Sequence, residues 1–205
     1  MSMHDELIKA AARLSGKGLL NRQGDALSMR LVGEGRMLIL EPGGVVRSLD
    51  LDDPGLGIAA THARVYQTRA DAGAVATLSP RWSLQLVGLG EAMPGIFDEQ
   101  ARHLGRNWAP TQAGKLAEAL ASGGNAGLVD GRLLVLGITR NRLLFNAELF
   151  EKCAMAYVLA RLGGGRVSKL PWIVRKVAGG RLLKDEAMAS ACHARGQRSP
   201  EPSGY

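Results

Sequence analysis

A histidine and a tyrosine four residues apart, His62 and Tyr66, have the types and spacing best suited to acid–base chemistry in this chain. Residues four apart lie on the same side of an α-helix, so the imidazole and the phenol would share one environment. Such a pair can exchange a proton with a bound substrate. The alternative is a structural role inside the helix.

The other histidines and Asp130 have simpler interpretations than a catalytic or metal-binding role. His4 and His193 lie near the chain ends and His103 lies between basic residues, so we expect no role for the first two and surface exposure for the third. No three histidines share a spacing typical of a metal site. Asp130 precedes Gly131, and an aspartate in a turn accounts for that pair.

Composition bounds the architecture. With 205 residues, 46% of them hydrophobic, the chain can bury one core, and we expect a single domain over 1–190 followed by a mobile tail over 194–205. No apolar run reaches the roughly 18 residues of a membrane span, and the first residues do not resemble a secretory signal. Cys153 and Cys192 lack CxxC spacing, which predicts a buried thiol and an incidental one in a reducing cytoplasm.

The positive charge is concentrated near the C-terminus. The chain carries a net charge of +7, and no acidic residue stands between Glu151 and Asp185. This stretch holds eight basic residues: Lys152, Arg161, Arg166, Lys169, Arg175, Lys176, Arg181 and Lys184. It could attract a phosphate-bearing ligand, a nucleic acid or an acidic partner. Because aromatic residues are few and no nucleic-acid-binding motif is visible, we expect a solvated basic face and no nucleic-acid or membrane partner.

Helical and strand-like patterns alternate along the chain. Helices are expected at 5–17, 61–69, 96–105, 111–121 and 141–162. Strands are expected at 26–32, 36–41, 74–78 and 133–136, with a hairpin connection at 33–35 and a loop at 50–57. Ser79 and Pro80 would begin a further helix as N-cap and first residue, although residues 81–87 also fit a strand. Gly163-Gly164-Gly165 would end the longest helix. Hairpins mixed with helices predict an α/β fold around a mixed sheet.

One stretch, His62-x-x-x-Tyr66-x-x-Arg69-x-Asp71-x-x-Ala74-Val75, joins an expected helix to an expected strand. It resembles a segment of the class II aldolase/adducin family, and a similar order and spacing of segments extends over residues 7–162. Three further segments are similar to family elements: Gly18 to Arg30, Leu38-Ile-Leu-Glu-Pro-Gly43, and Gly137 with Ala147-x-x-x-Glu151-x-x-Ala154. The resemblance implies a three-layer fold whose central sheet is largely antiparallel. It also implies a framework role for His62.

The departures from the family fall at functional positions. In the family, a His-x-His pair and a third histidine hold a catalytic divalent metal. The matching positions here are Thr77, Ser79 and Asp130. The family's phosphate-binding asparagine, turn threonine and Ser-Ser-Glu stretch match Ala26, Pro42 and 56–58. Hydroxyl side chains are poor ligands for a divalent ion, and one aspartate makes a weak hard-cation site at best. We therefore expect no metal and no cofactor.

The resemblance places several residues around a pocket. The ligand-binding positions it implies are Ser28, Arg30, Gly43, Thr77 and Ser79, and the catalytic candidates are His62, Tyr66 and Asp130. The family's cleft lies between subunits of a tetramer, where a neighbour's C-terminal segment can reach it. The basic segment 165–190 could fill that role for a small anionic ligand, or form an oligomer contact with Trp172 buried in it.

The sequence suggests three functions. The first is a non-catalytic, homo-oligomeric binding or regulatory protein. The second is a metal-independent or divergent lyase-type enzyme for a small oxo- or hydroxy-acid or a sugar-phosphate-like substrate. The third, a true metal aldolase, conflicts with the missing histidines. A crowded apolar pocket around Ala26, Ile58 and Thr77 would favour the first, and an open polar pocket would favour the second.

Overall fold

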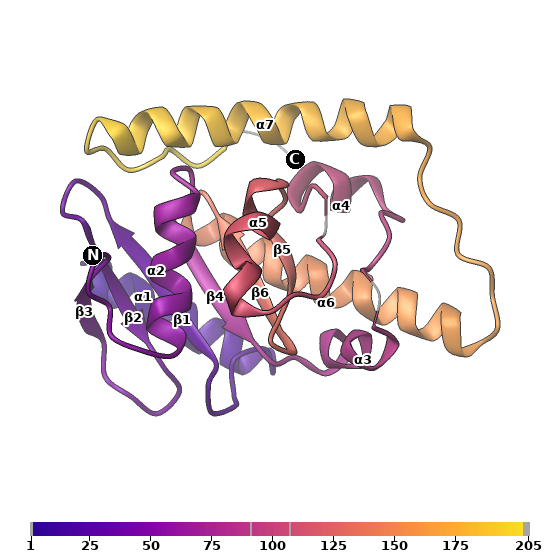
Figure 1. Ribbon diagram of the computed structural model, residues 1–205, viewed down its shortest axis with the longest axis horizontal. Coiled ribbons are helices and arrows are strands. Elements are labelled where there is room, and N and C mark those ends of the chain that lie inside the picture. The colour runs from indigo at the N-terminus through magenta and orange to yellow at the C-terminus, as the bar shows by residue number, and fades with distance from the viewer. Residues whose placement is uncertain (1, 91, 107, 203–205) are drawn as a thin grey trace.

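Six strands form one antiparallel sheet with the order β3-β2-β1-β4-β6-β5 (Figure 1). The computed structural model describes residues 2–90, 92–106 and 108–202. The strands are β1 (Ala26–Leu31), β2 (Arg36–Leu40), β3 (Arg47–Asp50), β4 (Ala74–Leu78), β5 (Ala126–Val129) and β6 (Arg132–Gly137). The helices are α1 (Met3–Gly16), α2 (Ile58–Thr68), α3 (Arg81–Leu89), α4 (Asp98–His103), α5 (Leu116–Ala121), α6 (Arg140–Leu162) and α7 (Trp172–Ala194), with a 3₁₀ turn at Ala113–Lys115.

Helices cover both faces of the sheet because β4 is buried on both sides. Ala74, Ala76 and Leu78 join the apolar cluster that includes α1, α3 and α6. Val75 joins the opposite cluster, which includes α2 and α5. Alternating side chains of a strand point to opposite faces, so one apolar strand supports two cores. The predicted α/β fold, with a largely antiparallel sheet between helical layers, is confirmed.

One predicted helix start is wrong by one residue. Pro80, and not Ser79, occupies the N-cap position of α3, which begins at Arg81. Ser79 is buried, and its hydroxyl accepts a hydrogen bond from the guanidinium of Arg132. Thus a tertiary contact uses the serine that local pattern assigned to capping.

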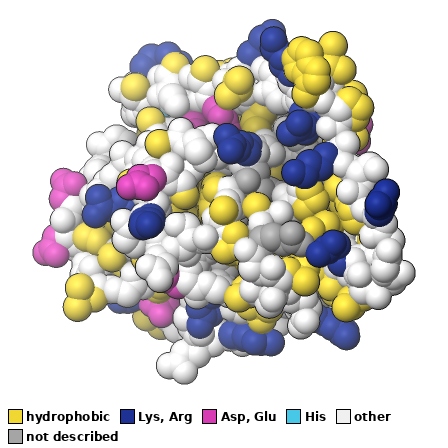
Figure 2. Space-filling view, turned by 45° about the vertical axis from the view of Figure 1, so that its right-hand side comes forward, with side chains coloured by type: hydrophobic (Ala, Val, Ile, Leu, Met, Phe, Trp, Pro, Cys, Tyr) yellow, Lys and Arg dark blue, Asp and Glu magenta, His cyan; other side chains and the backbone are white. Residues whose placement is uncertain are grey.

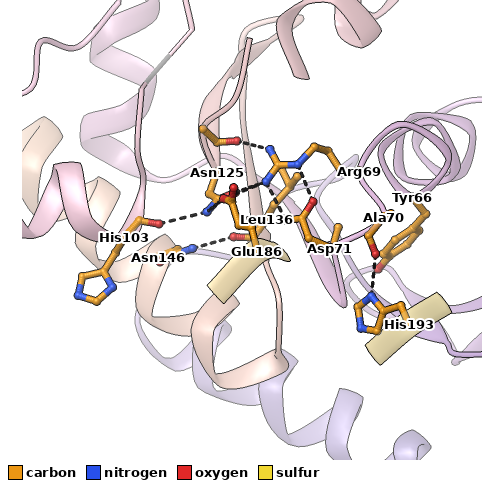
Figure 3. Close-up of polar contacts among 12 residues, drawn as sticks. Tyr66, Arg69, Ala70, Asp71, His103, Asn125, Leu136, Asn146, Glu186 and His193 are labelled. Atoms are coloured by element: carbon orange, nitrogen blue, oxygen red, sulfur yellow. Dashed lines mark hydrogen bonds and ion pairs between the residues drawn. The ribbon is translucent and has the colours of Figure 1, made fainter. Parts of the chain in front are cut away.

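Helix α7 crosses one edge of the molecule and is held by a buried ionic cluster (Figures 1 and 3). The guanidinium of Arg69 donates to both oxygens of Asp71 at 2.8 and 2.7 Å, and to Glu186 of α7 at 3.0 Å. Asn125 also donates to Glu186, at 3.0 Å. Burial raises the pKa of Glu186 while Arg69 lowers it. The contact between Arg69 and Glu186 joins residues 117 positions apart in the sequence.

Three side chains differ from their predicted environments. His103 was expected at the surface but is 5% exposed, with its ring edge-to-face against Phe145 at a centroid distance of 4.7 Å. Cys192 is buried, an environment that the sequence did not predict for it. His193 donates from Nδ1 to the carbonyl of Ala70 at 2.8 Å, so it also helps to seat α7 (Figure 3).

The segment after α7 makes polar contacts with the domain. Arg198 pairs with Glu6 at 2.7 Å, and the hydroxyl of Thr139 donates to Glu201 at 2.8 Å. The predicted mobility of the tail stays a prediction, and residues 203–205 lie outside the described residues. No helix in the described ranges is long and apolar enough to cross a membrane.

Candidate functional site

A pocket of about 530 Å³ opens between α2, α5 and the β5–β6 turn, beside the end of β4. Its apolar walls come mainly from Ile58, Leu116 and Val129. The polar side chains that line it are Thr61, Arg64, Thr77, Asp130 and Arg132. The pocket is therefore lined by both apolar and charged groups, and is neither filled nor purely apolar.

Arg132 is the most firmly held cation in this pocket. Its Nη1 donates to Oδ1 of Asp25 at 3.1 Å and to the hydroxyl of Ser79 at 2.8 Å, and its Nη2 donates to the carbonyl of Gln23 at 3.0 Å. A guanidinium has five N–H donors. Three are used, so two remain, and the side chain is 36% exposed. Arg132 can thus offer hydrogen bonds to an anion while its position is fixed.

The loop before β1 is shaped around this guanidinium. Gly24 has φ of 84°, and a Cβ there would lie 2.8 Å from Nη2 of Arg132. The carboxylate of Asp25 is also held from behind, because Oδ2 accepts the backbone N–H groups of Asn21 and Arg22 at 3.0 and 2.9 Å. Asp25 therefore both orients Arg132 and shares its negative charge with two amides.

A chain of buried hydrogen bonds runs inward from the pocket. Thr77 lies at the wall, and its Oγ1 is 3.0 Å from Nε2 of His62. Nδ1 of His62 is 2.8 Å from the hydroxyl of Ser28, which is 2.9 Å from the hydroxyl of Tyr66. Both ring nitrogens of His62 have hydrogen-bond partners, which explains why this polar side chain can be fully buried.

His62 is held neutral by its surroundings. Burial lowers its pKa to about 3, and burial raises the pKa of Tyr66 above its ordinary value. A general-base role would create a fully buried imidazolium, which is costly without a counter-charge. The geometry instead suits His62 to orienting the hydroxyl of Thr77 at the pocket wall.

Asp130 stands at the rim in a tight turn. Asp130 and Gly131 have φ of 47° and 74°, the left-handed conformations of a two-residue hairpin connection between β5 and β6. Oδ1 of Asp130 accepts the N–H of Ala113 at 3.2 Å. The turn thus explains the residue type, and the carboxylate still lines the pocket.

The second guanidinium at the pocket comes from α2. Thr61 and Arg64 are one helical turn apart and both line the pocket. Arg64 is exposed and, within the described part of the chain, its guanidinium has no ion-pair partner. Unlike Arg132, it is free to adjust to a ligand.

The structure separates the predicted ligand-binding residues. Thr77 lines the pocket, and Ser79 and Ser28 lie behind it as partners of Arg132 and His62. Arg30 instead donates to three backbone carbonyls at the end of α2: those of Tyr66, Arg69 and Ala72. Gly43 lies in the exposed turn between β2 and β3, outside the pocket lining.

Of the described residues that line the pocket, Asp130 is the only carboxylate, and none is a histidine, cysteine or glutamate. Among the described residues, no group of three His, Cys, Asp or Glu side chains could hold a metal ion. Moreover, the hydroxyl of Ser79 already accepts from a guanidinium. A metal ion bound beside Ser79 would be repelled by that guanidinium at short range.

A larger hollow of about 680 Å³ lies between α4 and α7, lined by Ile173, Val174 and Val177 together with charged residues of both signs. On the side of the molecule shown in Figure 2, Lys and Arg side chains lie among hydrophobic ones. Trp172, Ile173 and Val177 are respectively 65%, 56% and 73% exposed. The first pocket contains the positions that the family resemblance marks, Thr77 and Asp130, together with the hydrogen-bonded guanidinium of Arg132, so it is the candidate site.

Solved structures place the chain in the class II aldolase fold. It matches an L-fuculose 1-phosphate aldolase with a TM-score of 0.76 and 22% identity, covering 88% of this chain and 95% of the other. An L-fuculose 1-phosphate aldolase from Glaciozyma antarctica matches with a TM-score of 0.72 and 13% identity, covering 97% and 91%. The L-fuculose-1-phosphate aldolase from Thermus thermophilus matches with a TM-score of 0.64 and 21% identity, covering 79% and 96%. Neither a protein-family model nor a curated protein sequence matches the chain.

Proposed function

We propose that this protein binds a small anionic ligand in the pocket beside Arg132, without a metal ion. The observation that carries the proposal is the guanidinium itself, held by Asp25 and Ser79 with two N–H donors unused. In enzymes of the family that this chain resembles, a metal ion holds the ligand, and Ser79 matches one of the residues that bind that metal. Here a permanent positive charge on the protein takes over that task, because arginine stays protonated at all relevant pH values.

The binding role is compatible with a non-catalytic, regulatory protein and with an enzyme. Two observations support the second candidate, a metal-independent lyase-type enzyme for a small oxo- or hydroxy-acid or sugar-phosphate-like substrate. The pocket around Ile58 and Thr77 is open and partly polar, and the carboxylate of Asp130 is available at its rim as an acid or base. Turnover of such a substrate without added metal would establish it.

We further propose that the protein acts as a cytoplasmic homo-oligomer, with a tetramer as the expected form. The exposed apolar side chains of Trp172, Ile173 and Val177 support an oligomer contact along α7. Light scattering after size exclusion measures the assembly directly. A monomer at micromolar concentration would contradict this part of the proposal.

Calorimetric titration of the chelator-treated protein with glycolate and with inorganic phosphate tests the binding function. We expect binding in wild type, unchanged by chelator, and its loss in Arg132→Gln. Arg175→Gln is the matched control, since Arg175 belongs to α7 and lies outside this pocket. Binding that needs an added divalent ion, or a stoichiometric metal found by elemental mass spectrometry, would overturn the metal-free site.

A further inference from the structure

We infer that the pocket selects ligands with two separate anionic groups, one held by Arg132 and one by Arg64. This inference rests on the proposed binding function and adds the chemical class of the ligand. The two guanidinium groups come from different elements, since Arg132 begins β6 and Arg64 lies on α2. Both line the same pocket. A ligand with a single anionic group would satisfy one of these cations and leave the other to solvent.

The two cations suit different tasks. Arg132 is fixed by three hydrogen bonds, so it provides a preorganised anchor whose ordering entropy is already lost. Arg64 is exposed on α2, and its long side chain can reach the second anionic group of ligands of different length. A carboxylate or phosphate accepts two parallel hydrogen bonds from a guanidinium, which adds direction to the charge attraction.

The pocket between the cations adds a requirement for a hydroxyl group. Thr61 and Thr77 provide hydroxyl oxygens that can accept a hydrogen bond from a ligand, since the Thr61 hydroxyl donates to the carbonyl of Gly57 and that of Thr77 is bonded to His62. Asp130 provides a carboxylate, which accepts from a ligand hydroxyl and repels a third anionic group. Ile58, Leu116 and Val129 supply apolar wall for a short carbon chain. A volume of about 530 Å³ accommodates such a ligand.

The chemical class is therefore a short, hydroxylated carbon chain with an anionic group at each end. The anionic groups can be two carboxylates or one carboxylate and one phosphate. L-malate and 3-phosphoglycerate represent these two sources, and L-lactate is the matched ligand with one carboxylate. Succinate is the matched dicarboxylate without the hydroxyl.

Calorimetric titration of wild type, Arg64→Gln and Arg132→Gln with these four compounds tests the inference. We expect L-malate or 3-phosphoglycerate to bind wild type roughly tenfold to a hundredfold more tightly than L-lactate, the range of one charge-assisted hydrogen-bonded pair. Whichever of the two binds more tightly identifies the second anionic group. Arg64→Gln should abolish the difference from L-lactate, whereas Arg132→Gln should weaken every compound. Arg175→Gln should change nothing.

Two results separate the inference from the function on which it rests. Equal affinities for L-malate, 3-phosphoglycerate and L-lactate in wild type, with all binding lost in Arg132→Gln, would refute the two-anion ligand and keep the proposed site. An absence of binding for all four compounds would refute both. Because Arg64 is exposed and unpaired among the described residues, its substitution should leave folding intact.

Discussion

Replacing His62 should change how the stability of the protein depends on pH. The folded pKa of His62 is about 3, against 6.5 for an unperturbed histidine, and burial is the cause. As pH falls, the unfolded chain therefore takes up a proton before the folded protein does. The stability that neutral His62 contributes is fully present above pH 6.5 and is lost as the pH falls towards 3.

The magnitude follows from the two pKa values. Between about pH 7.5 and 5.0, the linkage relation gives a loss of about 2 kcal/mol from this one residue. Urea unfolding of wild type and His62→Gln at both pH values isolates the effect, because the other titrating groups cancel in the difference. We expect wild type to lose about 2 kcal/mol more than the variant over this interval.

Equal losses of stability in wild type and His62→Gln would refute the reasoning, because they would mean that His62 titrates normally in the folded protein. His103→Gln is a useful comparison, since burial and two nearby arginines lower the pKa of His103 to about 4. If His62→Gln does not fold, His62→Asn provides the same test with a smaller amide in the buried chain.

Three further substitutions test the packing and anchoring of the fold. Glu186→Gln should weaken the contact with Arg69 at 3.0 Å and lower the free energy of unfolding by about 1 kcal/mol. It should also speed proteolytic cleavage of α7. Cleavage at the wild-type rate would show that apolar contacts alone hold the helix. Gly127→Ala should lower the melting temperature by several degrees, because the new Cβ would lie 2.2 Å from the ring of Trp108; an unchanged value would contradict the packing. Thr139→Ala should cost about 1 kcal/mol in urea unfolding by removing the N-cap of α6, whereas Thr139→Ser should not.

The sequence predicted those elements whose structure depends on local pattern. The apolar run of β4 was predicted at 74–78 and is observed there. A strand buried on both faces is a continuous apolar run, so its first and last residues are easy to recognise in the sequence. The hairpin of β1 and β2 was marked by glycines on either side of Glu34. Helix α6 was predicted from 141 to 162, and its glycine-rich end is clear in the sequence.

The elements that sequence reasoning missed depend on distant partners. The α7 helix was not predicted, since exposed apolar side chains interrupt its amphipathic pattern and its main anchor, Glu186, binds Arg69 across the fold. Strands β3 and β5 have four residues each, too few for a periodicity to be recognised. The buried environment of His103 depends in the same way on Phe145, which lies on another helix.

Some residues at the candidate pocket were singled out from the sequence, and their roles stay predictions. Thr77, Ser79 and Asp130 were identified through the family resemblance, and the structure gathers them at or directly behind one pocket. Arg132 and Arg64, to which we assign anion binding as a proposal, were not singled out, because nothing local distinguishes an arginine that lines a pocket from a solvated one. The position of Arg132 directly after the Asp130-Gly131 turn was the available signal, because the first residue of a strand after a two-residue turn lies beside the preceding strand.

The hydroxyl side chains at positions 77 and 79 and the arginine at position 132 are best understood as one electrostatic arrangement. The hydroxyl of Thr77 is paired with a neutral imidazole, and that of Ser79 accepts from Arg132. A positively charged group at these positions would be repelled by the guanidinium. A hydroxyl has no net charge and can accept a hydrogen bond from it. Asp25 completes the arrangement, because its buried carboxylate accepts one hydrogen bond from Arg132, and the Arg132 side chain stays 36% exposed. It follows that Asp25→Asn should weaken anion binding less than Arg132→Gln does, since it loosens the cation without removing it.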